Sequence, residues 1–236
     1  MGYRMGFMYY DWTWFAVMIP CLLLSLYCSA KVKTTFNKYS KIPNSRMMSG
    51  ARAAEELLRA NGVTGVRIER VAGKLTDHFD PRTNVIRLSE SVYDSTSVAA
   101  IGVACHEAGH ACQHAEGYFP NKVRSAILPV ANIGSKFSWI LIIIGFMLPT
   151  KYDFVVTIGI ILYAAAVLFT VVTLPVEFNA SSRALKTIKA YHFLSEEEYP
   201  GASRTLRAAA MTYVASAATA ILQLLRLILI ATSRRR

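Results

Sequence analysis

Four long apolar segments stand out in the pattern of hydrophobic and polar positions along the chain. The first, Trp12 to Ala30, carries no charge and has about 20 residues, which is enough to cross a bilayer core. The others are Pro129 to Leu148, the uncharged run Phe154 to Val176, and Ala208 to Ile230. This pattern predicts a mainly α-helical membrane protein with about four hydrophobic helices.

The last apolar segment is less regular than the other three. It is rich in Ala, Ser and Thr, which let helices approach closely in a bilayer. Gln223 and Arg226 interrupt it, so the pattern leaves open whether residues 208–230 fully span the membrane.

Residues 45–125 follow a different pattern. Ser49 to Asn61 has the apolar spacing of a helix. Val66 to Val71 and Asn84 to Leu88 alternate like strands, with a turn at Pro81 between them. These elements predict a small α+β module, too short to bury a large core by itself.

A long helix completes the predicted module. It runs from Val98 to Glu116, with Asp94 or Ser95 as its N-cap, and it carries the HEAGH segment. The chain then divides into five predicted parts. These are an N-terminal span with a basic linker (1–44), the α+β module with the HEAGH helix (45–125), a membrane hairpin (126–176), a helix and cytoplasmic segment (177–207), and a hydrophobic helix with a basic tail (208–236).

Composition and charge narrow the class of protein further. The chain is 53% hydrophobic and 17% charged, which suits neither a disordered chain nor an ordinary soluble domain. The formal net charge is +11, but the basic residues flank apolar runs instead of forming a stripe interleaved with aromatic residues. They therefore indicate membrane topology, and we expect a lipid bilayer as partner and no nucleic acid.

The basic residues also predict an orientation. The stretch from Lys31 to Arg59 places the end of the first span, and hence the module, on the cytoplasmic side of the cell membrane. Two further crossings return the chain to that side at Glu177. The terminal run 234–236, which is all arginine, disagrees with a full fourth span, because it would lie outside.

The HEAGH segment has the spacing of a zinc site. His106 and His110 lie one turn apart on one helix face, so both imidazoles can bind one zinc ion. Glu107 is placed to take a proton from the metal-activated water and to deliver it to the leaving amine. The pattern therefore predicts one Zn²⁺ per chain and a hydrolase that uses Glu107 as its base.

Such a site needs a third protein ligand. His114 lies about 12 Å along the helix from His106, which is too far for one metal centre. Glu177 is favoured, because a carboxylate at the end of an apolar span is costly unless it is paired or metal-bound. Three alternatives stay open, namely a simple pairing of Glu177 with Arg183, a ligand role for His78, and one for a cysteine near the histidines (Cys105 or Cys112).

The segments NVIRLSES, SVAAIGVAC, HEAGHA and LPVEFNASSRA together resemble the putative neutral zinc metallopeptidase family (YugP-like) over nearly the whole chain. The arrangement is also similar to HtpX-like and CAAX prenyl membrane proteases. This resemblance implies a gluzincin-like module in which His106, His110 and Glu177 bind zinc and Glu107 is the catalytic base.

The resemblance also has a departure and some further implications. Relatives often carry an aspartate near Asn179 or Ser181 to support a ligand histidine, and this chain has no acid at either place. Arg183 is a candidate oxyanion stabiliser, for which a phospholipid or Glu177 is the favoured alternative partner, and His114 is a candidate supporting or solvated histidine. The resemblance further implies a substrate-binding edge strand, for which an ordinary sheet strand is the alternative. Its residues are Asn84, Val85, Ile86, Arg87 and Leu88.

These observations predict a membrane-embedded zinc metalloendopeptidase that hydrolyses peptide bonds at the cytoplasmic membrane face, with peptides or membrane proteins as substrates. The alternative is a non-catalytic membrane protein with a structural zinc site or a partner-binding module. A structural site would close the fourth zinc position with a protein ligand, and the sequence offers no convincing fourth ligand.

Overall fold

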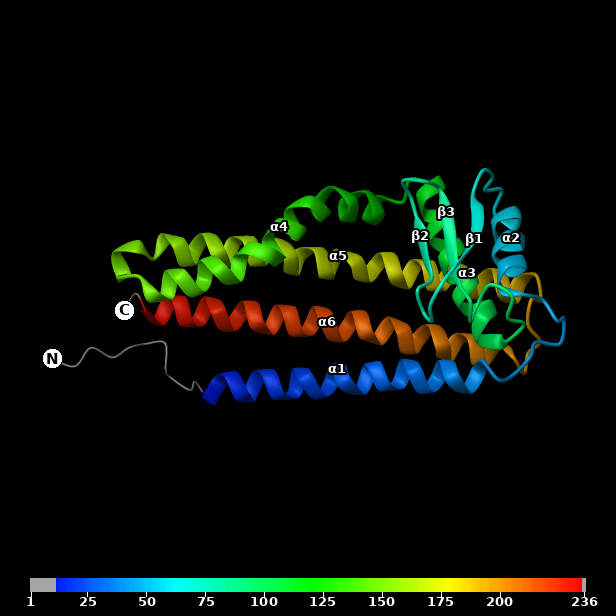
Figure 1. Cartoon of the computed structure of the whole chain (residues 1–236), viewed down its shortest axis with the longest axis horizontal. Coiled ribbons are helices and arrows are strands. Elements are labelled where there is room, and N and C mark those ends of the chain that lie inside the picture. The colour runs from blue at the N-terminus through cyan, green and yellow to red at the C-terminus, as the bar shows by residue number, and fades with distance from the viewer. Residues whose placement is uncertain (1–11, 235–236) are drawn as a thin grey trace. The chain divides into compact units, whose positions relative to one another are not determined.

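The structure is a computed structural model that describes residues 12–234 (Figure 1). Over these residues the chain is mostly helical, with one small sheet. The elements in chain order are α1 (Trp12–Tyr39), α2 (Gly50–Ala60), β1 (Arg67–Val71), β2 (His78–Asp80), β3 (Val85–Ser89), α3 (Val98–Ala115), α4 (Phe119–Met147), the 3-10 helix η1 (Thr150–Tyr152), α5 (Phe154–Ala190) and α6 (Tyr199–Arg234).

The chain forms two compact units, and both are discontinuous in sequence. Within the described residues, the hairpin unit consists of 12–27, 123–173 and 213–234. The module unit consists of Cys28–Lys122 and Leu174–Thr212. The long helices are continuous across the boundary between the units, which is why sequence segments do not coincide with compact units.

Among residues 12–234, four helices are long and apolar enough to cross a membrane, as the sequence predicts, and they are α1, α4, α5 (together with η1) and α6. All four continue well beyond the apolar runs, because the flanking residues include good helix formers such as Ala, Lys and Arg. The 37 residues of α5 span about 55 Å, whereas a bilayer core is about 30 Å thick. The segment of α5 after Val176 is therefore helix beyond the length that the core requires.

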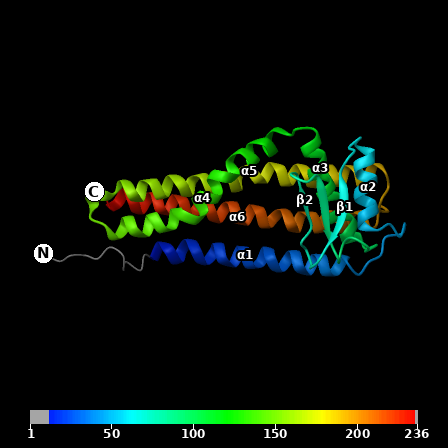
Figure 2. The same cartoon turned by 45° about the horizontal axis from the view of Figure 1, so that its top comes forward.

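In the hairpin unit, α4 packs closely against the first part of α5, and the two lie side by side in both views (Figures 1 and 2). A Cβ atom on Gly134 would lie 2.2 Å from the carbonyl oxygen of Leu162. A Cβ atom on Gly159 would lie 3.0 Å from the backbone nitrogen of Ile142. Both glycines are thus required by backbone contact, as is common where helices pack in lipid.

The end of α6 is held at the turn between α4 and α5, also within the hairpin unit. Arg234 Nε lies 3.3 Å from Asp153 Oδ1. Its terminal nitrogens donate to the carbonyl oxygens of Gly145, at 2.9 Å, and of Leu148. These carbonyls belong to the last turn of α4 or follow it directly, where a cation interacts favourably with the helix dipole. The charge of Arg234 is therefore neutralised locally, so this residue is weaker evidence against a fourth membrane span than its charge alone suggests. The other two arginines of the terminal run, 235–236, lie outside the described residues.

In the module unit, both shorter helices begin at serine N-caps. Ser49 accepts a hydrogen bond from the backbone nitrogen of Arg52 at 3.3 Å. Ser97 caps α3 by accepting from Ala100 N at 3.2 Å. The predicted cap at Asp94 or Ser95 is wrong by two or three residues, because Ser95 instead donates its hydroxyl to Ser97 at 3.0 Å.

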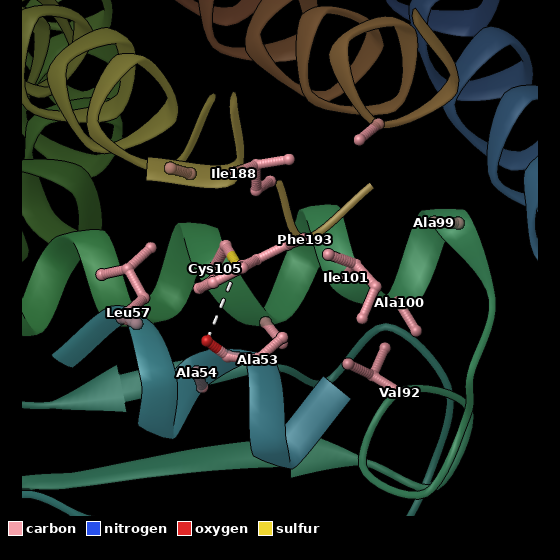
Figure 3. Close-up of a cluster of buried hydrophobic side chains, with 14 of the residues drawn as sticks. Ala53, Ala54, Leu57, Val92, Ala99, Ala100, Ile101, Cys105, Ile188 and Phe193 are labelled. Atoms are coloured by element: carbon pink, nitrogen blue, oxygen red, sulfur yellow. Dashed lines mark hydrogen bonds between the residues drawn. The ribbon is translucent and has the colours of Figure 1, made fainter. Parts of the chain in front are cut away.

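The core of the module unit lies between α2, α3 and the end of α5 (Figure 3). Leu57, Ile101, Ile188 and Phe193 are among its largest fully buried side chains. Cys105 is buried among them and donates a weak hydrogen bond to the carbonyl oxygen of Ala53 at 3.9 Å. The α5 segment thus supplies part of the core that the module was predicted to lack by itself.

The sheet has the order β1-β3-β2, so β3 is its central strand (Figure 1). β1 pairs with it in parallel and β2 pairs with it antiparallel. Beyond β2, Asp77 Oδ1 accepts the backbone hydrogen of Ser89 at 2.7 Å. The prediction that Asn84 to Leu88 form an exposed edge is therefore wrong, and the ordinary-strand alternative is correct. The three-residue strand His78–Asp80, which covers this edge, is too short to show alternation in the sequence.

Candidate metal centre

Helix α3 and helix α5 approach each other closely at the HEAGH segment. A Cβ atom on Gly109 would lie 2.7 Å from the carbonyl oxygen of Ala180 and 3.3 Å from its Cα. Because Gly109 has no side chain, the α5 backbone can lie directly against α3 at this point. Ala180 is fully buried there. This contact places Glu177, one turn earlier on α5, beside His106 and His110.

The two histidines and the glutamate form a compact triangle. The Nε2 atoms of His106 and His110 are 3.1 Å apart. Glu177 Oε2 lies 3.3 Å from the first of these nitrogens and 3.6 Å from the second. Among the described residues, this is the group of ligand-type side chains that can hold one metal ion.

These separations fit tetrahedral zinc. With zinc–ligand distances of about 2.0–2.1 Å, two ligand atoms of a tetrahedron lie about 3.3 Å apart. The side chains of the three residues are 14%, 13% and 5% exposed, in chain order. Glu177 Oε2 is buried and accepts no hydrogen bond of normal geometry. A buried carboxylate oxygen of this kind requires a cation, which supports a metal at the centre of the triangle.

The electrostatics of the site also favour positive charge. Burial lowers the pKa of His110, but the neighbouring Glu177 carboxylate and the charge of Glu107 raise it more, so its pKa lies above the ordinary value. The same field that stabilises a proton on this ring stabilises a metal cation between the rings.

Each histidine is held from behind by a neutral group. Ser181 Oγ lies 3.1 Å from Nδ1 of His106. Gln113 Oε1 lies 3.1 Å from Nδ1 of His110. Partners at Nδ1 fix the ring orientation and leave Nε2 for the metal. In this chain the two partners are a hydroxyl and an amide. This agrees with the absence of an acidic residue at positions 179 and 181, where relatives often carry an aspartate.

Gln113 is itself held rigidly, although it is a polar side chain with no exposure. Its amide nitrogen donates to the carbonyl oxygen of Val176 at 2.8 Å and to Asn179 Oδ1 at 3.0 Å. Both hydrogen bonds cross from α3 to α5. Gln113 was not among the residues predicted from the sequence, where its only signal is its position one turn beyond His110 on the same helix face.

Arg183 extends this network to the protein surface. Its two terminal nitrogens donate to the two carboxylate oxygens of Glu116 at 2.6 and 2.7 Å, and its Nε donates to Asn179 at 2.7 Å. This bidentate pairing lowers the pKa of Glu116. The partner of Arg183 in the structure is thus Glu116, and not Glu177 as the alternative reading had it.

Glu107 lies beside the first ligand of the triangle. Its side chain is buried on α3, with 8% of the residue exposed, and no hydrogen bond occupies its carboxylate within residues 12–234. Asp77 is close enough to interact with it: burial raises the pKa of Asp77, bonds to Ser89 lower it, and the charge of Glu107 raises it. A carboxylate left free in this position is available to a water molecule at the metal.

The remaining candidate residues lie outside the triangle. The ring of His114 is exposed and contacts Phe79, with ring centroids 5.7 Å apart. His78 is exposed, and its Nδ1 lies 2.8 Å from the carbonyl oxygen of Thr76. Cys105 and Cys112 are free and buried, and burial raises the pKa of both thiols, that of Cys112 to about 11. Neither cysteine belongs to the group of side chains whose ligand atoms can hold one metal ion.

Comparisons with known proteins agree with the geometry. Residues 14–232 match a family described as putative neutral zinc metallopeptidase. The chain is 45% identical over 212 residues to the "Putative membrane protease YugP" of Bacillus subtilis (strain 168), which covers 90% of this chain and 93% of that protein. No solved structure matches the chain. Because the family match extends over nearly the whole sequence, this chain belongs to the putative neutral zinc metallopeptidases.

Proposed function

We propose that the chain is a membrane-embedded zinc metalloendopeptidase. The observation that supports this most directly is the triangle of His106, His110 and Glu177, whose ligand atoms lie at the mutual distances of a tetrahedral zinc site. Three protein ligands leave the fourth position for water and substrate, as in catalytic zinc sites.

In this proposal, zinc supplies a Lewis acid that lowers the pKa of a water molecule towards neutrality and polarises the scissile carbonyl. Glu107 accepts the proton of that water and delivers it to the leaving amine. Its free carboxylate next to His106 supports this role. Ser181 and Gln113 hold the two imidazoles in the orientation that presents Nε2 to the metal.

A structural zinc site is the alternative, and the structure offers it little support. Such a site closes the fourth position with a protein ligand. Within the described residues, the candidate group contains three ligand-type side chains and no fourth. A structural site would also leave the position of Glu107 next to His106 without a role.

We place the site at the cytoplasmic face of the cell membrane. The basic residues that follow the apolar part of α1 support this orientation, since cytoplasmic segments are enriched in lysine and arginine. Peptides or unfolded segments of membrane proteins are the proposed substrates. β3 is unavailable for pairing with them, because both of its edges are covered.

The decisive experiment compares zinc content and cleavage in purified protein. Wild type should contain about one zinc per chain and cleave fluorescent casein or an unfolded membrane protein. Glu107→Gln should retain the zinc and lose cleavage by at least 100-fold, because the general base is gone. Glu177→Ala should lower the zinc content.

A matched control is Glu55→Gln, which removes one carboxylate from an exposed position on α2. It should match wild type in both measurements. Cleavage by Glu107→Gln at the rate of wild type would disprove the assigned base. Full zinc content without cleavage of any tested substrate by wild type would instead favour the structural site.

A further inference from the structure

The module unit contains a pocket that is formed entirely by the last part of α5 and the first part of α6. Its volume is about 540 Å³, within the range of small-molecule sites. The walls are mainly apolar, with Phe178, Leu185, Leu206 and Met211 among the lining residues. Phe178 and Met211 are about half exposed, so the pocket is open along its side.

Two cations line this apolar pocket, Lys186 from α5 and Arg207 from α6. Both are exposed, and neither forms an ion pair within residues 12–234. No acidic residue lines the pocket. An apolar cavity with two unpaired positive charges is complementary to a ligand that has an apolar body and an anionic head.

The pocket occupies a different face of α5 from the metal centre. Successive residues of a helix are rotated by about 100°, so Phe178, Ser182 and Leu185 lie about a third of a turn away from the Glu177 and Ala180 face. Ser181 is at the border: it lines the pocket, and its hydroxyl contacts the ring of His106. Through Ser181, a ligand in the pocket borders the Nδ1 side of His106, whereas the candidate metal triangle is formed by its Nε2 atom.

The helices that line the pocket also determine which ligand can reach it. Both belong to candidate membrane spans. The apolar run of α5 ends at Val176, so the pocket begins where that helix leaves the length of a bilayer core. Phospholipid headgroups lie at this depth, and basic pockets between membrane helices bind anionic headgroups.

We propose that this pocket binds an anionic phospholipid, with the acyl chain against Phe178 and Met211 and the headgroup at Lys186 and Arg207. An apolar peptide side chain is a poorer fit, because it would leave both cations unpaired. The proposal is independent of the peptidase activity, since it concerns only the α5–α6 face.

Native mass spectrometry of delipidated protein in detergent tests the proposal. The probes are phosphatidylglycerol and phosphatidylcholine with identical acyl chains, so that only the net headgroup charge differs. Wild type should bind phosphatidylglycerol about 30-fold more tightly, because each of two nearby cations strengthens binding about fivefold. Lys186→Gln combined with Arg207→Gln should abolish this preference.

The control variant, Lys33→Gln with Lys41→Gln, removes the same charge from exposed positions outside the pocket and should keep the preference. Ala210→Phe, which fills the pocket from α6, should weaken binding of both lipids. Equal binding of the two lipids by wild type, or a preference that survives loss of both pocket cations, would overturn the proposal. The readout is lipid binding alone, so it stands or falls separately from any cleavage assay.

Discussion

Gly109 offers the sharpest test of how the metal centre is assembled. It is the fourth residue of HEAGH, and neither metal chemistry nor proton transfer requires a glycine there. Its role in the structure is steric, because the added Cβ of Gly109→Ala would lie 2.7 Å from the carbonyl oxygen of Ala180. An ordinary contact begins at 3.4 Å. The α5 backbone must therefore move away by about 0.7 Å to admit the methyl group.

That displacement exceeds the tolerance of a metal site, whose ligands must be held within about 0.5 Å. Overpacking of this kind typically costs about 1–3 kcal/mol. If this free energy is lost from zinc binding because Glu177 is displaced, zinc affinity falls about 5- to 150-fold. Glycine to alanine in a helix otherwise stabilises the helix by about 1 kcal/mol, so the variant should still fold.

The assay is zinc affinity, measured by competition with a chelating dye on metal-depleted protein. The matched control is Gly102→Ala, two turns earlier on the same helix. Its added Cβ would lie 3.4 Å from Ala202, which is an ordinary contact. Gly102→Ala should therefore bind zinc as wild type does. Wild-type zinc affinity in Gly109→Ala would refute the argument that close approach of α5 places the third ligand.

Three further predictions follow from other contacts. Gln113→Leu should lower zinc affinity by about 10- to 100-fold, because the ring of His110 loses the contact that orients it. The same competition assay measures this, and an unchanged affinity would show that the amide is dispensable. Bonds from Thr83 and Arg87 hold the pKa of Asp80 well below its usual value, so its stabilising effect is complete above about pH 4 and is lost as the pH falls further. Thermal melting between pH 5 and pH 3 should therefore decline more steeply for wild type than for Asp80→Asn, and parallel curves would contradict this. Arg234→Gln should lower the melting temperature in detergent, because Asp153 loses its ion pair with Arg234 and two backbone carbonyl oxygens, of Gly145 and Leu148, lose their hydrogen bonds from it. The double variant with Asp153→Asn should recover part of this loss.

The fold could be predicted from sequence where a signal is periodic and local. Hydropathy located all four candidate spans, and apolar spacing located α2 and α3 to within a few residues. Hydropathy could not give the full lengths of the spanning helices, because residues such as those between Val176 and Ala190 are helical without being apolar. It also missed β2, since a three-residue strand has no periodicity and is stabilised by its partner.

The candidate site was predicted unevenly for the same reason. The HEAGH spacing identified two candidate ligands, because helix geometry alone sets the distance between them. The choice of Glu177 needed the cost of a carboxylate at the end of an apolar span, and the geometry of the triangle agrees with it. Gln113 and Ser181 could not be identified, because their roles depend on how α3 and α5 pack, which no local pattern records.

The route of the chain through α4 and α5 has a consequence for biosynthesis. His106 and His110 are translated before the hairpin, and Glu177 comes only after it. A nascent chain that has not yet inserted α5 holds two of the three metal-binding side chains and cannot complete the triangle. Assembly of the candidate metal site therefore depends on synthesis of α5, so the proposed activity requires the complete α4–α5 hairpin.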